Sequence, residues 1–388
     1  VATNSEPARL LTALLEYAVA HNASDLHLDP HATGGFVSLR IDGDLYSHHD
    51  PAYPLSVHRK LVKRLKVLSQ LDCANMHVPQ DGSVLFDAVS PTVYLRVAII
   101  PTVDGEKVTI RLLHSGARFR LHELGIEREL LSRLEVLLEK RSGGILVAGV
   151  TGSGKTTTLY AVLEHLVAKG CQCISVEDPV ERRLPGVVQS EVNHKHGLDY
   201  ESYLTAVLRQ DPDVVLVGEL RTGEAAQHAC EAALSGHLVL STVHARDALG
   251  VLLRLNYLGV DLQLLAHSVR CVLYQSLVPI LCENCKEIDQ VEQRRMCDTR
   301  GELVDTLYRP RGCESCNMTG FHGRAPVNEV LFIDQAFSES ILRCNNDMAA
   351  LRRDLTDRQR FPLTHTALRL LQRGAITWSQ MLEICEGR

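Results

Sequence analysis

The hydrophobic positions of this chain repeat with two different spacings, one typical of helices and one typical of strands. Helical spacing predicts helices at residues 5–20, 126–139 and 157–169. Alternating or uninterrupted apolar runs predict strands at residues 36–41, 94–100, 144–149, 174–176, 214–217 and 238–243. Because strands and helices alternate from residue 126 onward, we expect a parallel sheet covered by helices in that part of the chain.

The same pattern predicts how the chain is divided into domains. It predicts a smaller mixed α+β domain at residues 1–115, a linker at residues 116–125 and a larger α/β domain at residues 126–388. A chain of 388 residues with 45% hydrophobic content can form two or three domains, each with its own core.

Residues 149–156 read Gly-Val-Thr-Gly-Ser-Gly-Lys-Thr, a complete phosphate-loop motif between a predicted strand and a predicted helix. Its glycines permit positive φ, so that backbone N–H groups can point at phosphates beside a helix N-terminus. We expect Lys155 to contact the β- and γ-phosphates of ATP and Thr156 to ligate Mg²⁺. The residues expected to contact the nucleotide are Gly149, Thr151, Gly152, Ser153, Gly154, Lys155, Thr156 and Thr157. A glycine-rich turn that matches by chance is the alternative.

Acidic residues follow two of the predicted strands, where phosphates are expected to lie. We expect Glu177 to orient the attacking water and Glu219 to hold the metal, with the reverse assignment also open. Asp178 could instead cap the helix that follows. His237 and His244 bracket the predicted strand 238–243, and each is a candidate sensor of the γ-phosphate, although a lone histidine is usually structural.

Four of the twelve cysteines form two C-x-x-C pairs, Cys282 with Cys285 and Cys313 with Cys316, with 27 residues between the pairs. Two such pairs predict a tetrahedral structural zinc site that folds a subdomain at about residues 280–325. A redox pair or a chance pairing is the alternative. Most of the other cysteines are expected to be buried small apolar residues, including Cys73, Cys171, Cys173, Cys230 and Cys271.

The net charge of −6 and the dispersed Lys and Arg residues do not favour a nucleic-acid partner. We expect the basic stretch 59–66 to form a solvated helix face. No apolar run approaches the roughly 18–20 residues that span a bilayer, and no secretory signal opens the chain, so we expect a soluble cytoplasmic protein. The first residue is Val rather than Met, which is compatible with a fragment of a longer protein.

In combination, these motifs resemble the secretion ATPases of type II secretion, type IV pilus assembly and DNA-uptake competence pili. Residues 176–181 resemble the acidic box of that family, residues 208–221 its Walker B segment and residues 235–244 its histidine box. The paired cysteines are similar to the zinc subdomain of its assembly branch. In the N-terminal region the resemblance rests on residues 23–27, 40–43, 79–82 and 105–111.

The resemblance implies a RecA-like ATPase domain preceded by a PAS-like domain that supplies Arg96 and Arg111 to the nucleotide, with Arg209 and Arg221 as further arginines of the catalytic domain. It implies ATP, Mg²⁺ and Zn²⁺ as cofactors. It also implies a ring of six at the cytoplasmic face of the inner membrane, peripheral to it, where platform and anchoring proteins are the partners. The implied function is an ATP-driven motor for pilin or pseudopilin assembly, without direct contact to nucleic acid.

The chain departs from the family pattern at Val150, Ser83, Thr222 and Thr205, and Val278-Pro279 replaces a basic pair. It also lacks the additional N-terminal domain of the long members, either because that domain was cut away or because the chain belongs with the short competence-type members. Three other functions stay open: a pilus-retraction ATPase, a nucleic-acid translocase and a ring subunit that binds ATP without hydrolysing it.

Overall fold

The computed structural model describes residues 6–41, 43–47, 52–90, 93–113, 119–192, 197–289, 296–297, 303–304, 306–344, 351–353 and 363–385. Contacts divide the chain into two compact units, Val1–Ala117 and Arg118–Arg388, which we call the N-terminal and the C-terminal unit. The first residues of the predicted linker, 116–118, lie outside the described residues, and Leu121–Glu123 forms a short 3-10 helix.

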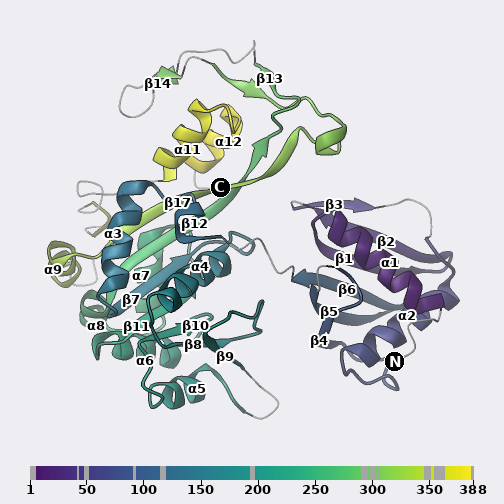
Figure 1. The fold of residues 1–388 in the computed structure, drawn as a ribbon, viewed down its shortest axis with the longest axis horizontal. Coiled ribbons are helices and arrows are strands. Elements are labelled where there is room, and N and C mark those ends of the chain that lie inside the picture. Colours follow the sequence, from purple (N-terminus) through teal and green to yellow (C-terminus); the bar gives the residue numbers. More distant parts are fainter. Residues whose placement is uncertain are drawn as a thin grey trace. The chain divides into compact units, whose positions relative to one another are not determined.

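The N-terminal unit is a six-stranded antiparallel sheet with the strand order β3-β2-β1-β6-β5-β4 (Figure 1). Its strands are β1 Ala23–His31, β2 Gly34–Ile41, β3 Asp44–Ser47, β4 Gln80–Phe86, β5 Val93–Thr102 and β6 Gly105–Leu113. The helices α1 (Glu6–Ala20) and α2 (Leu55–Leu68) pack on this sheet through buried leucines. In β5, buried residues alternate with more exposed ones, because successive side chains of a strand point to opposite faces.

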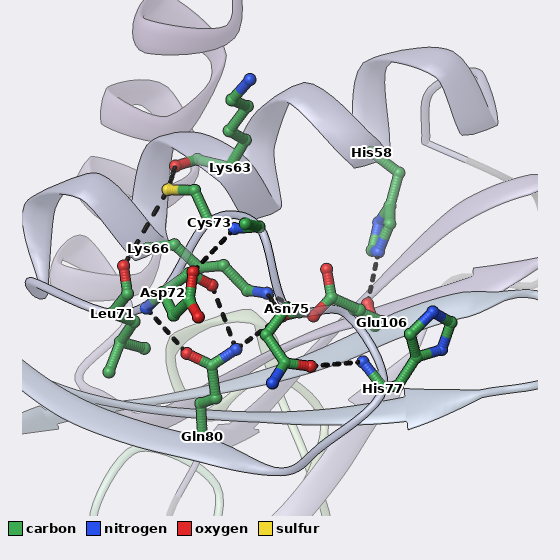
Figure 2. A network of polar contacts seen from close by, with 11 residues as sticks. His58, Lys63, Lys66, Leu71, Asp72, Cys73, Asn75, His77, Gln80 and Glu106 are labelled. Atoms are coloured by element: carbon green, nitrogen blue, oxygen red, sulfur yellow. Dashed lines mark hydrogen bonds and ion pairs between the residues drawn. The ribbon is translucent and has the colours of Figure 1, made fainter.

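Polar contacts fix the loop between α2 and β4, and they centre on an ion pair between Lys66 and Glu106 (Figure 2). The Lys66 amine lies 2.7 Å from Oε1 of Glu106 and donates to the Asn75 carbonyl at 2.7 Å. The side-chain amide of Gln80 forms hydrogen bonds with the same loop. Its oxygen accepts from the Asp72 N–H at 2.9 Å, and its nitrogen donates to the Asn75 carbonyl at 2.7 Å. The expectation of a solvated face over residues 59–66 is therefore wrong for Lys66, whose side chain is 1% exposed.

The C-terminal unit contains a seven-stranded sheet with the order β17-β12-β7-β11-β10-β8-β9, in which all neighbours are parallel except β12 and β17. The strands are β7 Gly143–Ala148, β8 Cys173–Glu177, β9 Val187–Glu191, β10 Val214–Val217, β11 Leu238–Val243, β12 Val269–Leu281 and β17 Phe321–Phe332. Short strands pair in the segment between the two cysteine pairs, namely β13 Glu287–Ile288 with β16 Tyr308–Arg309, and β14 Met296–Cys297 with β15 Leu303–Val304.

Helices cover both faces of this sheet, which confirms the expected α/β class (Figure 1). On one face lie α3 (Arg128–Glu139) and α4 (Lys155–Ala168). The other face packs against α5 Tyr200–Val207, α6 Gly223–Leu234, α7 Ala248–Tyr257, α8 Leu262–Ser268 and α9 Gln335–Arg343. Because β7 is buried on both sides, Ile145 contributes to one core and Leu146 to the other.

The long pair β12 and β17 extends to the cysteine segment. The helices α11 (Leu363–Gln372) and α12 (Trp378–Cys385) form a smaller core with this extension (Figure 1). Within the parts of the chain that the structure describes, no helix is both long enough and apolar enough to cross a membrane.

Candidate nucleotide site and cysteine cluster

The phosphate loop joins β7 to α4, as its motif predicts. Gly149, Gly152 and Gly154 have φ values of 151°, 79° and 86°, which lie in the region that favours glycine. Gly154 caps α4, so backbone N–H groups at the start of this helix face the loop, as an anion site requires. Thr151 and Thr157 are exposed, whereas Ser153 is buried.

Lys155 and Thr156 lie at the start of α4 and contact neighbouring polar groups. The Lys155 amine donates to the carbonyl oxygens of Gly149 and Val150 at 2.9 Å each. Burial lowers the pKa of Lys155, while the carboxylates of Glu219 and Glu181 act in the opposite direction. The Thr156 hydroxyl donates to Oε1 of Glu181 at 3.1 Å.

The strand order brings the carboxyl ends of β7, β11, β10 and β8 to one edge of the sheet. The phosphate loop, His244, Glu219 and Glu177 come from these four ends, although they are far apart in the sequence. Glu219 forms an ion pair with Arg221 at 2.8 Å, and its other oxygen lies 3.3 Å from Nε2 of His244. The structure therefore groups these residues at the edge where the loop lies.

Glu177 is the most enclosed acid of this edge, with 4% of the residue exposed. Its carboxylate accepts hydrogen bonds from the Tyr160 hydroxyl, from the Ser175 hydroxyl at 2.6 Å and from the Gln189 amide at 3.1 Å. Burial raises the pKa of Glu177, and the three donors oppose that rise. The side chain thus ties α4, β8 and β9 together.

Glu181 is a site residue that the sequence motifs alone did not single out. It belongs to the same acidic segment as Glu177, yet it is Glu181 that reaches the hydroxyl of Thr156, the expected magnesium ligand. The available signal was its position in the acidic box, four residues after Glu177.

The structure does not bring His237 or Arg209 to the phosphate loop. His237 precedes β11 at its amino end, where its carbonyl accepts from the N–H of Gly143, the first residue of β7. Exposed Arg209 follows α5, and the next residue, Gln210, accepts from the Gln172 side chain just before β8. Both residues lie at the sheet edge opposite the loop, because neighbouring parallel strands begin at the same edge.

In the N-terminal unit, Arg96 and Arg111 are direct cross-strand partners of β5 and β6. Residues opposite each other in an antiparallel pair present their side chains on the same face. Both arginines are exposed, and Nε of Arg111 donates to Oδ1 of the buried Asp25 at 2.9 Å. Two arginines fifteen positions apart in the sequence therefore form one cationic pair.

The four cysteines of the two C-x-x-C pairs form one cluster, with all four sulfurs within 4.8 Å of one another. Sulfur–sulfur distances are 3.9 Å for Cys282–Cys313, 3.8 Å for Cys285–Cys316 and 3.7 Å for Cys313–Cys316. A tetrahedron with metal–sulfur bonds of about 2.3 Å has edges of about 3.8 Å, so the cluster fits zinc. Backbone N–H groups of Cys313 and Gly320 point at the Cys316 sulfur, each at 3.2 Å.

Of the five cysteines expected to be buried outside the cluster, four are buried, and the expectation is wrong for Cys73. Cys171, Cys173, Cys230 and Cys271 are buried, whereas Cys73 is half-buried. Burial raises the pKa of the Cys271 thiol to about 12, which leaves it protonated at neutral pH.

The family model described as "Type II/IV secretion system protein" matches residues 2–383. The chain belongs to this family. It is 39% identical to the type II secretion system protein E of Dickeya dadantii (strain 3937), over 97% of this chain and 75% of that protein. It is 40% identical to the type II secretion system ATPase E of Vibrio cholerae serotype O1, over 86% of this chain and 66% of that protein. The resemblance inferred from the motifs is confirmed.

Solved structures of low sequence identity share the fold of this family member. The ATPase DotB of Legionella pneumophila matches with a TM-score of 0.74 and 19% identity, over 100% of this chain and 98% of that one. The pilus retraction motor PilT with bound ADP matches with a TM-score of 0.67 and 22% identity, over 96% of both chains. At these identities the likeness shows the fold alone.

Proposed function

We propose that this protein is an ATP-hydrolysing motor that drives pseudopilin or pilin assembly in a type II secretion, type IV pilus or competence machine. The observation that carries the proposal is the grouping of the phosphate loop, Glu219 and His244 at one sheet edge in a chain of the secretion family. Relatives with 39% and 40% identity carry the names of a type II secretion protein and a type II secretion ATPase.

The loop residues fit a triphosphate. The Ser153 hydroxyl is buried and, among the described residues, has no hydrogen-bond partner. Lys155 donates to loop carbonyls, which it can exchange for phosphate oxygens while keeping its charge near Glu219 and Glu181. We assign Thr156 to Mg²⁺, which when bound neutralises charge on the β- and γ-phosphates.

We retain Glu177 for orienting the attacking water and Glu219 for the metal, and we add Glu181 as a competitor for either role. Three donors already occupy the carboxylate of Glu177. Glu181 instead touches Thr156. A carboxylate that orients water must reach that water directly, so amide variants of Glu177 and Glu181 decide between these two acids.

We also propose that the C-terminal unit is RecA-like, that the N-terminal unit is PAS-like, and that the boundary between the domains lies near residue 115. The chain would assemble as a ring of six at the cytoplasmic face of an inner membrane, where platform and anchoring proteins of the machine hold it. In this arrangement Arg96 and Arg111 meet the γ-phosphate. We assign Cys282, Cys285, Cys313 and Cys316 to structural zinc, which when bound fixes the cysteine segment.

Phosphate release by the purified protein tests the proposed ATPase site. We expect Lys155→Ala to lose nucleotide binding and turnover, because it removes the charge that contacts the β- and γ-phosphates. We expect Glu219→Gln to bind ATP while its turnover falls by about 10² or more, as the loss of a charge-stabilising group predicts. The exposed Lys169→Ala is the control and keeps wild-type rates.

Glu177→Gln and Glu181→Gln complete the series. The acid that orients water is the one whose amide variant loses turnover but keeps nucleotide affinity. Unchanged steady-state activity of Lys155→Ala would contradict the assignment of the site. Equal and negligible rates for wild type and Glu219→Gln would favour a ring subunit that binds ATP passively.

A further inference from the structure

The amide of Gln275 in β12 lies against the phosphate loop from inside the protein. Gln275 is 5% exposed. Its Nε2 donates to the Ser153 carbonyl at 2.7 Å, and its Oε1 accepts from the Thr158 hydroxyl at 2.7 Å. Gln275 therefore joins the last turn of the loop to the first turn of α4, from a strand that lies on the other side of β7 from β11.

The chemistry of the two partners fixes the orientation of this amide. A backbone carbonyl can only accept, so the nitrogen of Gln275 must face Ser153. The Thr158 hydroxyl then donates to the amide oxygen. Rotation of the amide by half a turn would place two acceptors against each other at Ser153, which is costly because both groups are buried.

This contact also sets the direction of a backbone N–H in the loop. In a trans peptide the carbonyl and the following N–H point in opposite directions. Because the Ser153 carbonyl points into the protein at Gln275, the Gly154 N–H points away from Gln275 and out of the core. Outward N–H groups in this turn are what a phosphate loop offers to its anion.

Close packing adds a second constraint. A Cβ atom at Gly149 would lie 2.2 Å from the backbone oxygen of Gln275, and a Cβ at Gly154 would lie 2.7 Å from its Nε2. Both ends of the loop thus press against this one residue. Gly149 is therefore required by contact with the backbone of β12 as well as by its φ angle, while Gly154 is required by its φ angle.

We propose that Gln275 is a positioning residue of the nucleotide site, which holds the phosphate loop in its anion-binding conformation without touching the phosphates. The inference rests on the proposed ATP site. It implies that β12 contributes to nucleotide affinity. This strand ends at Leu281, directly before Cys282.

A buried amide can also contribute to the stability of the fold without any effect on nucleotide binding. A second buried amide in the chain serves as the control for that role. Asn328 of β17 is the cross-strand partner of Gln275 and is 3% exposed. Its side chain donates to the Leu124 carbonyl at 3.5 Å, outside the loop. Asn328→Leu removes a buried amide from the same rung of the sheet and leaves the loop contacts intact.

The experiment measures the affinity of the full chain for a fluorescent ADP with Mg²⁺, together with KM, kcat and the melting temperature. We expect Gln275→Leu to lower the melting temperature more than Asn328→Leu, because Gln275 makes two hydrogen bonds of 2.7 Å whereas the Asn328 side chain donates one of 3.5 Å. Only Gln275→Leu should weaken nucleotide affinity and raise KM, by about tenfold, as loss of one buried hydrogen bond predicts. Thr158→Val, which releases the amide oxygen of Gln275, should change affinity in the same direction by less.

Gln275→Glu should make nucleotide affinity depend on pH, which a purely stabilising role of Gln275 does not predict. Its carboxylate would face the Ser153 carbonyl without a proton, whereas the protonated acid can donate to that carbonyl. The nucleotide affinity of this variant should therefore be higher at a pH of about 5 than at neutral pH. This comparison is made within one variant, so it remains decisive if Gln275→Leu does not fold.

Wild-type affinity in Gln275→Glu at all pH values would overturn the inference, as would equal effects of Gln275→Leu and Asn328→Leu on affinity. Failure of the wild type itself to bind nucleotide is a separate result. It would overturn the proposed function, whereas the other two outcomes leave that function in place.

Discussion

Glu177 shows how burial changes the behaviour of a carboxylate. The acid follows a predicted strand, and its type and position suggest a catalytic role. In the structure, however, three donors surround it, and burial raises its pKa. Such an acid can hold neighbouring elements in place even where it does not touch a substrate.

The raised pKa of Glu177 predicts a pH dependence of stability. The folded protein holds this proton more strongly than the unfolded chain, so the free energy of unfolding should fall as the pH rises from the ordinary value of 4.5 through the raised pKa. The slope of this fall is at most about 1.4 kcal/mol per pH unit, since a single proton is involved. We expect this slope to vanish in Glu177→Gln, because the amide does not titrate.

Urea unfolding of both proteins at several pH values between about 4 and 8 measures this difference. Glu139→Gln is the control, since the side chain of Glu139 is 67% exposed. Identical profiles for wild type and Glu177→Gln would contradict a raised pKa at this position.

At the scale of elements, the cysteine cluster depends both on the local C-x-x-C spacing and on the pairing of two strands that are far apart in the sequence. The spacing of each C-x-x-C pair places two sulfurs on one turn, and this much is readable from the sequence. The strand pairing of β12 with β17 then brings the two pairs together, since β12 ends just before Cys282 and β17 begins shortly after Cys316.

The zinc assignment predicts the behaviour of Cys282→Ser. We expect wild-type protein to carry close to one zinc per chain and the variant to lose it, because three thiolates bind more weakly than four. Proteolysis of the segment around residues 280–325 should then become faster. Cys271→Ser, a buried cysteine outside the cluster, is the control for metal content. Wild-type protein without zinc by elemental analysis would refute the assignment.

At the scale of the whole molecule, we propose that residues of both units take part in the chemistry. The C-terminal unit contains the phosphate loop and its acids, while the N-terminal unit presents the pair Arg96 and Arg111 on an exposed sheet face. A guanidinium keeps its charge at all physiological pH values and offers two parallel donors to phosphate oxygens. Under this proposal, hydrolysis requires both units.

We expect Arg96→Ala and Arg111→Ala to reduce kcat by about 10³ or more with little change in nucleotide affinity, as loss of an arginine from the γ-phosphate predicts. Arg59→Ala, in the exposed face of α2, is the control. Mixing Arg111→Ala with Lys155→Ala should restore part of the activity if one chain supplies arginines to the loop of another. Wild-type rates in both arginine variants would rule out this division of roles.

The sequence by itself determined the features that depend on neighbouring residues. The phosphate loop, its three positive-φ glycines and the flanking strand and helix follow from a contiguous motif, because steric limits on φ act within one residue. The parallel α/β character of the C-terminal unit follows from alternating periods of apolar residues.

Only the tertiary structure decided which distant residues meet. The strand order β7-β11-β10-β8 differs from the chain order, so it places β11 and β10, with His244 and Glu219 after their carboxyl ends, next to the strand that leads into the loop. Close packing likewise buried Lys66 beside Glu106 and set Gln275 against the loop. Such contacts depend on long-range pairing and on the shape of the packed core, which no local pattern of residues specifies.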